Sequence, residues 1–191
     1  MLHVDIPSRA DADEKFIQAV QRRAQMSDKV RRFDQALTRQ AVALDRLAEL
    51  TGSSDLSQLS VQRLESLERH WQLNDRALAQ TRTELARATN IASEDAAELA
   101  ERRAAWQATS TQPYLSPALL KRSDEMVAKV DAAQTMLADP LAKLLDLGRR
   151  SNTLATQVQK GVAEVVGQVA EQDRRLVMMD TPPMWQALRD A

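Results

Sequence analysis

The side chains best suited to metal binding or acid–base chemistry in this 191-residue chain are its two histidines, His3 and His70. A metal site on a helix needs a second ligand three or four residues away, so that both side chains share one face. Glu65 and Glu68 are the acidic neighbours of His70, and neither forms a His-x-x-x-His or Glu-x-x-His pair with it. We therefore expect a structural or solvent role for His70, and we predict no metal-ligating residues.

The sequence also shows no residue pattern typical of nucleophilic catalysis. The chain has no cysteine, which excludes thiolate catalysis, disulfides and cysteine-ligated zinc. Its serines stand mainly at expected caps and turns, without a Gly-x-Ser-x-Gly elbow, and no glycine-rich phosphate loop occurs. The sequence predicts a protein that is not an enzyme, with no catalytic residues, no cofactor-binding residues and no cofactor.

Charge and hydropathy limit the partners. The 26 basic and 27 acidic residues balance to a formal net charge of -1, without the clustered basic excess of a nucleic-acid-binding protein. No stretch approaches 18 consecutive apolar residues, so we expect no membrane span in this chain. The start, Met1 to Asp5, has no basic region followed by an apolar core and is not an intact signal peptide.

The strongest pattern is a seam of small or apolar residues at alternating three- and four-residue spacing. It comprises Leu64, Leu67, Trp71, Asn74, Leu78, Thr81, Leu85 and Ala88, and it keeps its phase through Ala92, Ala96, Leu99, Arg103 and Trp106. Such spacing lines one face of a helix and requires partner helices to bury it. We expect the tryptophans to fill the core, and the polar Asn74, Thr81 and Arg103 either to set register or to face solvent.

The whole chain fits one all-α fold class: an elongated, antiparallel three-helix bundle with spectrin-like coiled-coil packing. Helices are predicted over about 12–50, 58–109 and 117–179, forming a single rod domain over 12–179. Residues 1–11 are expected to be an extended lead-in, and 180–191 a tail leading to a missing segment. Trp185 in this tail is expected to dock on the bundle or to anchor a neighbouring domain or a bilayer interface.

Several residues mark turns or irregularities within these helices. Gly52 is expected to cap the first helix in a left-handed conformation, and Ser116-Pro117 to cap and begin the third. Asn90 allows a break in the second helix, although phase continuity favours one helix. Pro140 allows a restart of the third, although the spacing around it favours a kink. Three glycines expected inside the third helix suggest close helix approach, bending or simple tolerance: Gly148, Gly161 and Gly167.

Four stretches resemble the periplasmic helical region of large mechanosensitive channels of the small-conductance family. They are Ile6-Pro7-Ser8-Arg9-Ala10-Asp11, the helical stretch with Asp28-Lys29 and Ala36-Leu37-Thr38, Leu147-Gly148-Arg149-Arg150, and Asp180-Thr181-Pro182-Pro183-Met184-Trp185. The resemblance implies a periplasmic domain of an inner-membrane protein with a role in ion transport. Its implied partners are the protein's own membrane channel domain and other subunits or envelope proteins. No pore residue carries over, because the family's pore lies in a membrane part outside this chain.

Two other readings remain open. A free-standing coiled-coil interaction or adaptor protein would share the same seam and would be cytoplasmic. An enzyme or ligand-binding helical sensor would need a polar cavity between helices, which the near-continuous seam leaves little room for. Such a cavity would be sought around Asn74 and Thr81. Apolar residues outside the seam could form a second face for association, and the oligomeric state stays open: Leu47, Leu50, Leu73 and Leu145.

Overall fold

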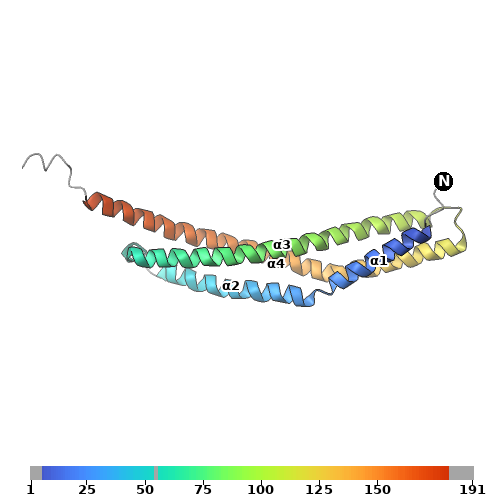
Figure 1. Ribbon diagram of the computed structural model, residues 1–191, viewed down its shortest axis with the longest axis horizontal. Coiled ribbons are helices and arrows are strands. Elements are labelled where there is room, and N and C mark those ends of the chain that lie inside the picture. Colours follow the sequence, from blue (N-terminus) through green and yellow to red (C-terminus); the bar gives the residue numbers. More distant parts are fainter. Residues whose placement is uncertain (1–5, 54–55, 181–191) are drawn as a thin grey trace, which may run out of the picture. The chain divides into compact units, whose positions relative to one another are not determined.

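The protein is an all-α helical bundle, as predicted (Figure 1). The computed structural model describes residues 6–53 and 56–180, without the side chains of Ser53 and 176–180, and this part of the chain contains helices and no strand. The elements are α1 (Ile6–Ala24), α2 (Ser27–Ser53), a short 3₁₀ turn η1 (Leu56–Gln58), α3 (Val61–Ser110) and α4 (Pro117–Asp180). None of the described helices has the length and hydropathy that crossing a membrane requires.

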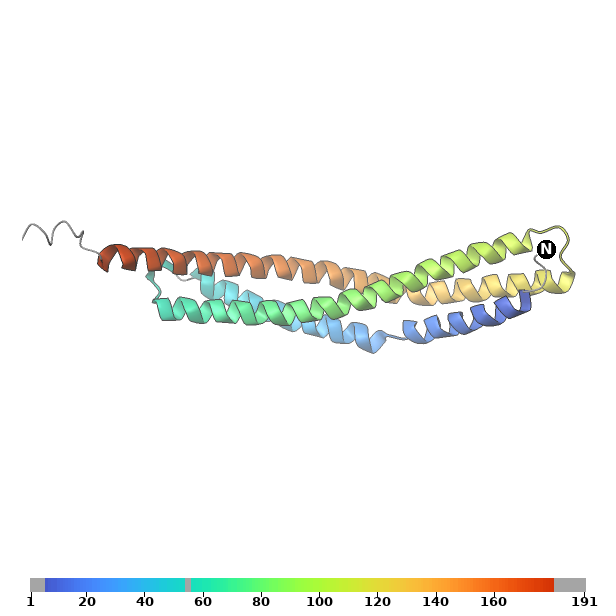
Figure 2. The same ribbon diagram turned by 45° about the horizontal axis from the view of Figure 1, so that its top comes forward.

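The contacts group into two compact units. Unit 1 comprises Met1–Gln35 and Thr83–Arg149; unit 2 comprises Ala36–Arg82 and Arg150–Ala191. Within each unit the helical segments run side by side, as both ribbon views show (Figure 2). The single rod domain expected over 12–179 stays a prediction. The two units are not separated along the sequence, since α2, α3 and α4 each contribute residues to both.

Side-chain pairs reveal the helix directions within each unit. In unit 1, Asp13 of α1 pairs with Arg102 of α3, and further along α1, Arg23 pairs with the earlier Asp95. Since the partner moves back as α1 advances, α1 and α3 are antiparallel. In unit 2, α2 and α4 are parallel, because Thr38 bonds Arg150 and Asp45 bonds Gln157, both 112 residues apart.

The seam of α3 is buried at every seventh residue. Its fully enclosed members are Leu64, Trp71, Leu78, Leu85, Ala92, Leu99 and Trp106. The alternate positions Leu67, Asn74 and Thr81 are only half-buried, whereas Ala88 is fully buried. A seven-residue repeat keeps one stripe of a long helix turned toward its neighbours. The predicted seam is therefore confirmed, and so is the core position of both tryptophans.

The seam of α4 follows the same spacing but carries many small or polar side chains. Its positions are Ser123, Met126, Val130, Ala133, Leu137, Pro140, Leu144, Leu147, Ser151, Leu154, Val158, Gly161 and Val165; Pro140 is half-buried and the rest are buried. Other apolar side chains of α4, such as the exposed Val166, lie outside this seam. Size, and not hydrophobicity alone, selects the residues of this seam.

The prediction of one helix over 12–50 is wrong, since Gln25 and Met26 interrupt it between α1 and α2. The seam of α1 runs through Ala10, Asp13, Ile17, Val20 and Ala24. Continued without a break, its three-four spacing would turn polar side chains inward: Ser27, Arg31 and Asp34. The apolar Val30 and Phe33 stand one position earlier. The interruption allows the chain to rotate so that Phe33 enters the core.

Other local predictions have mixed outcomes. The extended lead-in is wrong for residues 6–11, which belong to α1. Gly52 lies inside α2 without a positive φ, so its predicted left-handed cap is also wrong. Ser116 does cap α4, accepting the Leu119 backbone N–H with its Oγ at 3.4 Å, and Pro117 is the first helical residue.

The helix breaks considered at Asn90 and Pro140 do not occur, because α3 continues through Asn90 and α4 through Pro140. The kink at Pro140 stays a prediction. The tail expected over 180–191, with Trp185, lies outside the described residues apart from Asp180, which ends α4.

Gly161 explains how α4 approaches α3 in unit 2. A Cβ built on Gly161 would overlap the six-membered ring of Trp71, which is buried and cannot move aside. Close helix approach is thus confirmed for Gly161. Gly148 and Gly167 have open space where a Cβ would point, so a packing role does not extend to them.

Replacing Gly161 with alanine should destabilise the protein by about 1–3 kcal/mol, because overpacking outweighs the better helix propensity of alanine. The matched control Gly167→Ala should stabilise it by up to about 1 kcal/mol. Urea unfolding followed by circular dichroism measures both free energies. Equal stabilisation by the two substitutions would contradict the close packing of Gly161 against Trp71.

Candidate functional site

The residues singled out for chemistry lie apart from one another. His70 is exposed on α3, and its Nδ1 bonds the Ser66 backbone oxygen at 2.6 Å. His3 lies outside the described residues. Among the residues that are described, no group of three or more histidine, cysteine, aspartate or glutamate side chains stands close enough to hold a metal ion. The absence of catalytic, cofactor-binding and metal-ligating residues stays a prediction.

The polar interruptions of the α3 seam serve packing in different ways. Thr81 accepts a hydrogen bond from Gln40 Nε2 of α2 at 3.1 Å, which ties the register of the two helices. Asn74 donates to the His70 backbone oxygen of its own helix at 2.9 Å. Arg103 is half-exposed and pairs with Asp131 of α4. Thr81 therefore helps to set the register of two helices, whereas Arg103 lies partly in solvent.

The most concentrated polar cluster lies in unit 1, around a carboxylate that the sequence analysis did not single out. Asp13 of α1 is 3% exposed. One of its oxygens accepts the indole N–H of Trp106 at 2.7 Å, and the other accepts from the Arg102 guanidinium. Arg9, one turn earlier on α1, lies 3.8 Å from the first oxygen. A buried carboxylate is stable only with partners of this kind.

The two arginines also contact aromatic rings. The Arg9 guanidinium carbon lies 4.9 Å from the ring centre of Trp106, and that of Arg102 lies 4.4 Å from the ring centre of Phe16. Cations over aromatic faces are favourable, more so when shielded from water. Burial, and then the charge of Arg9, lower the pKa of Arg102, which nevertheless stays charged at neutral pH.

Further ion pairs join α1 to both neighbouring helices of unit 1. Glu14 accepts from Lys129 Nζ at 2.6 Å and from Arg122 at 2.7 Å, both on α4. The hydrogen bond from Lys129 is the largest influence that lowers the pKa of Glu14. Arg23 forms a two-point bond to the buried Asp95 of α3, with N–O distances of 2.8 and 2.6 Å. This hydrogen bond raises the pKa of Arg23.

This cluster is suited to holding α1 in place and is poorly suited to proton transfer. Arginine does not release its proton near neutral pH, and an indole N–H only donates a hydrogen bond. The open depression above it is lined by Arg9, Asp13, Glu98, Glu101, Arg102 and Ala105. Arg102 is also paired with Glu98 at 2.6 Å, so the charges of this depression mostly satisfy one another.

Sequence reasoning missed Asp13 because it searched for apolar residues. The available signal was phase: Ala10, Ile17 and Val20 share the seam on which Asp13 stands. An acidic residue at a core position requires a buried donor, and Trp106 is one of the few side chains that can supply it. The sequence alone does not show which helix carries that donor.

Comparison with known proteins assigns this chain to no family. No family model matches the chain, and no curated protein or solved structure matches it significantly.

Replacing Asp13 with alanine should lower the free energy of unfolding by about 2–4 kcal/mol, because the indole N–H and the Arg102 guanidinium lose their shared acceptor. Asp11 is exposed on the same helix, so Asp11→Ala should change stability by less than about 0.5 kcal/mol. Chemical denaturation of both variants measures the difference. Similar small losses would show that Asp13 is not a significant anchor.

The ion pairs of Glu14 predict a pH dependence. Its pKa in the folded protein lies below the ordinary 4.5, so its contribution is present above that pH and is lost as pH falls through the lower folded value. Glu14→Gln should therefore destabilise the protein at pH 7 and match the parent at strongly acidic pH. Stability curves from pH 7 to 2 test this, with the exposed Glu94→Gln as control. A Glu14→Gln deficit that persists at the acidic end would contradict it.

Proposed function

We propose that this chain is a non-catalytic periplasmic helical domain of a mechanosensitive ion channel of the small-conductance family. Its role would be structural or sensory: it would pack against the channel domain or other envelope proteins and influence gating. Ion conduction itself would belong to the membrane part. The protein would then lie in the periplasm as part of an inner-membrane protein.

The observation that carries the non-catalytic part is how the buried polar groups are used. Asp13 is shared among Trp106 and the arginines, and Asp95 is occupied by Arg23. In unit 2, Trp71 donates to Thr51 at 3.4 Å. Each of these groups joins one helix to another instead of pointing together into a cavity. Such an arrangement favours a mechanical or binding role over catalysis.

The channel assignment rests on the sequence resemblance. The stretch Ile6–Asp11 now stands at the start of α1, where Arg9 and Ala10 contribute to the unit 1 cluster and core. Leu147 is buried, while Arg149 and Arg150 on the same turn of α4 are exposed. The closing stretch 181–185 lies outside the described residues.

A free-standing interaction or adaptor protein is the second candidate. It is favoured by large apolar side chains that remain on the surface. Leu50 and Leu73 are more than half exposed, and Leu145 nearly so. Leu50 also lines an apolar groove of unit 2 together with Leu47, Leu59 and Leu67. Contiguous apolar surface of this kind is typical of partner-binding faces. Such a protein would act in the cytoplasm.

The two candidates differ in which side of the inner membrane holds the domain. Tyr114, in the turn between α3 and α4, is 91% exposed, and the chain has no cysteine. We expect Tyr114→Cys in the full-length protein to react in intact cells with a charged maleimide that crosses only the outer membrane. Mass spectrometry of the purified protein measures the labelled fraction.

The control is Leu99→Cys, at a fully buried position of α3, which should react only after denaturation. Comparison with the unsubstituted full-length protein corrects for cysteines elsewhere in it. If Tyr114→Cys is labelled only after the inner membrane is broken, the periplasmic proposal fails and the cytoplasmic adaptor is favoured.

A further inference from the structure

The helix α1 buries little apolar surface for its length. Its buried residues are Ala10, Asp13, Ile17, Val20 and Ala24. Only Ile17 and Val20 among them have large aliphatic side chains, whereas the buried apolar residues of α2 are all large: Phe33, Leu37, Leu44 and Leu47. Most of the stability of a helix within a protein comes from packing of its apolar face. We therefore expect α1 to be held less firmly than α2.

The backbone hydrogen bonds of α1 and α2 end and begin at the junction between them. The Gln25 N–H bonds the Gln21 oxygen at 3.3 Å and closes α1. The first bonds of α2 are those of the Lys29 and Val30 N–H groups, both to the Met26 oxygen, at 2.9 and 3.0 Å. Since these bonds need no residue of α1, α2 can stay helical when α1 moves. Gln25 and Met26, in the short link between α1 and α2 in Figure 2, therefore form a hinge.

Carboxylates make the polar contacts that hold α1 against its neighbours in unit 1. They are Asp13 and Glu14 of α1 and Asp95 of α3. Their partners on the facing helix are Arg102 for Asp13, Arg122 and Lys129 for Glu14, and Arg23 for Asp95. A carboxylate loses its charge when the pH falls to about 4 or below. Acid therefore weakens the contacts of α1 with both α3 and α4.

Protonation would also turn attraction into repulsion. The sequence of α1 contains four basic and three acidic residues, so neutralising the acidic ones leaves a strongly cationic helix. Cationic side chains face it from the other helices: Arg102, Arg122 and Lys129. Burial lowers the pKa of Arg102, and the charge of Arg9 lowers it further, so these two guanidinium groups repel each other across Asp13. Without the charge of Asp13, this repulsion is no longer offset.

Further acidic groups around α1 titrate in the same pH range. Glu98 of α3 pairs with Arg102 at 2.6 Å, and Glu125 of α4 lies 3.6 Å from Arg122. Glu101 of α3 lines the open depression beside Asp13. Protonation of these groups removes negative charge that offsets the facing cations, so it acts in the same direction.

Several contacts within unit 2 involve no group that titrates in acid. They are the hydrogen bonds from Gln40 to Thr81, from Trp71 to Thr51, and from Gln172 to the Leu59 backbone oxygen. Acid leaves these bonds and the buried leucines of α2, α3 and α4 unchanged. We therefore expect these three helices to remain folded at a pH at which α1 is released.

We propose that α1 is a pH-sensitive strap, which moves away from α3 and α4 about Gln25 and Met26 when the carboxylates that hold it are protonated. It leaves as one unit, while α2, α3 and α4 stay helical. Release uncovers Trp106, whose indole N–H is bonded to Asp13 and whose ring lies beside Arg9. A fall in pH is thereby converted into exposure of an apolar face. The proposal does not depend on whether the chain belongs to a channel or to an adaptor.

Thiol labelling of the 191-residue protein tests the release, because the chain has no cysteine of its own. Val20→Cys places a thiol at a fully buried position of α1, and the control Val158→Cys places one at a fully buried position of α4 in unit 2. A pyridyl disulfide is a suitable reagent, since it reacts with thiols in acid as well as at neutral pH. Each labelling rate is divided by that of the denatured variant at the same pH.

Between about pH 7 and about pH 3.5, labelling of Val20→Cys should accelerate at least about tenfold more than labelling of Val158→Cys. The reason is that release takes up protons, and each proton taken up raises the opening equilibrium constant by up to about tenfold per pH unit. Circular dichroism at the acidic end should show that the helix content of α2, α3 and α4 is retained.

A charge-neutral variant gives a second readout at constant pH. In the Val20→Cys protein, Asp13→Asn removes the buried charge with little change in size and should accelerate labelling at pH 7 at least about tenfold. The exposed Asp11→Asn is the matched control and should leave the rate unchanged. In the Val158→Cys protein, Asp13→Asn should have no effect, because that thiol lies in unit 2.

Two outcomes overturn the proposal. Equal acceleration of Val20→Cys and Val158→Cys in acid would mean that the protein unfolds as a whole and that α1 is not a separate unit. Slow labelling of Val20→Cys at every pH, and also in combination with Asp13→Asn, would mean that the carboxylates do not control the position of α1.

Discussion

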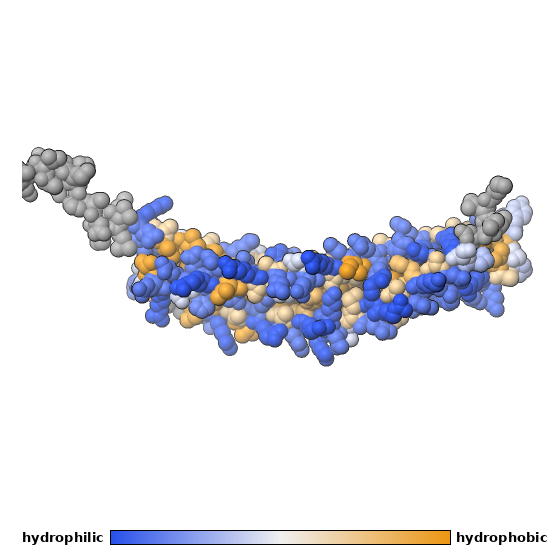
Figure 3. All heavy atoms as spheres, in the orientation of Figure 1, coloured by the Kyte–Doolittle hydropathy of each residue, from blue (hydrophilic) through white to orange (hydrophobic). Residues whose placement is uncertain are grey.

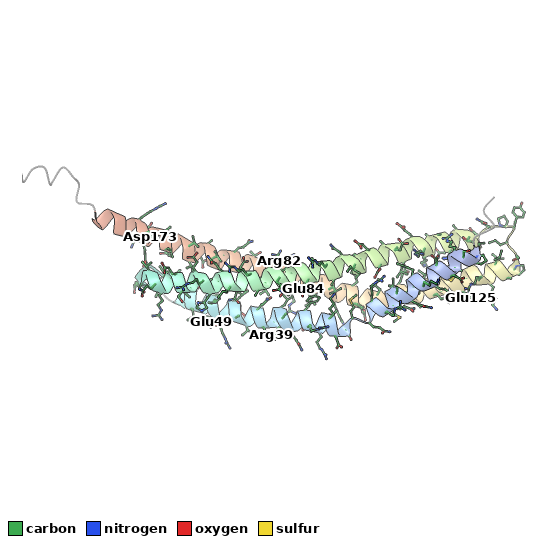
Figure 4. The ribbon with its side chains drawn as sticks, viewed as in Figure 1. Arg39, Glu49, Arg82, Glu84, Glu125 and Asp173 are labelled. Atoms are coloured by element: carbon green, nitrogen blue, oxygen red, sulfur yellow. The ribbon has the colours of Figure 1, made fainter. Side chains whose placement is uncertain are left out.

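The constraint on which the structure depends is that a long helix can bury only a narrow stripe, and its neighbours must follow that stripe. In α3 the stripe returns every seventh residue, from Leu64 to Trp106. A straight α-helix of 3.6 residues per turn drifts from this period, so the helices that cover it must drift with it. Many side chains outside the stripe are charged or polar, and they alternate with apolar ones over the face in Figure 3. Arg39, Glu49, Arg82, Glu84, Glu125 and Asp173 are exposed examples (Figure 4).

The stripe also decides where large and small residues can stand. Trp71 occupies a seam position of α3, and the seam of α4 has a glycine, Gly161, where the indole lies against it. Trp106 occupies another, and Ser123 of α4 donates to its backbone oxygen at 2.9 Å. Two bulky side chains could not share such a level, because interiors are close-packed. Gly161 of α4 therefore accommodates the Trp71 indole, whereas Ser123 contacts the backbone of Trp106.

The two units use different polar contacts around their seams. In unit 1, α1 carries Asp13 and Arg23, and each is paired with an oppositely charged group on α3. A buried charge costs several kcal/mol unless it is paired, so a register of α1 that left Asp13 or Asp95 without its arginine would be strongly disfavoured. In unit 2, the contacts described above include neutral ones, such as Gln40 with Thr81 and Trp71 with Thr51. Such bonds guide register at a lower cost if broken.

The sequence by itself determined the helical class, the seam of α3, the capped start of α4 at Ser116 and Pro117, and the core position of both tryptophans. These follow from periodicity and local backbone chemistry, which act over a few residues. It did not determine the break at Gln25 and Met26, the small-residue seam of α4, or the burial of Asp13. Those depend on which side chain of another helix lies opposite, and that is decided only when distant segments pack together. The apolar groove lined by Leu47, Leu50, Leu59 and Leu67 belongs to the same class, because α2, α3 and the turn between them must pack together before it exists.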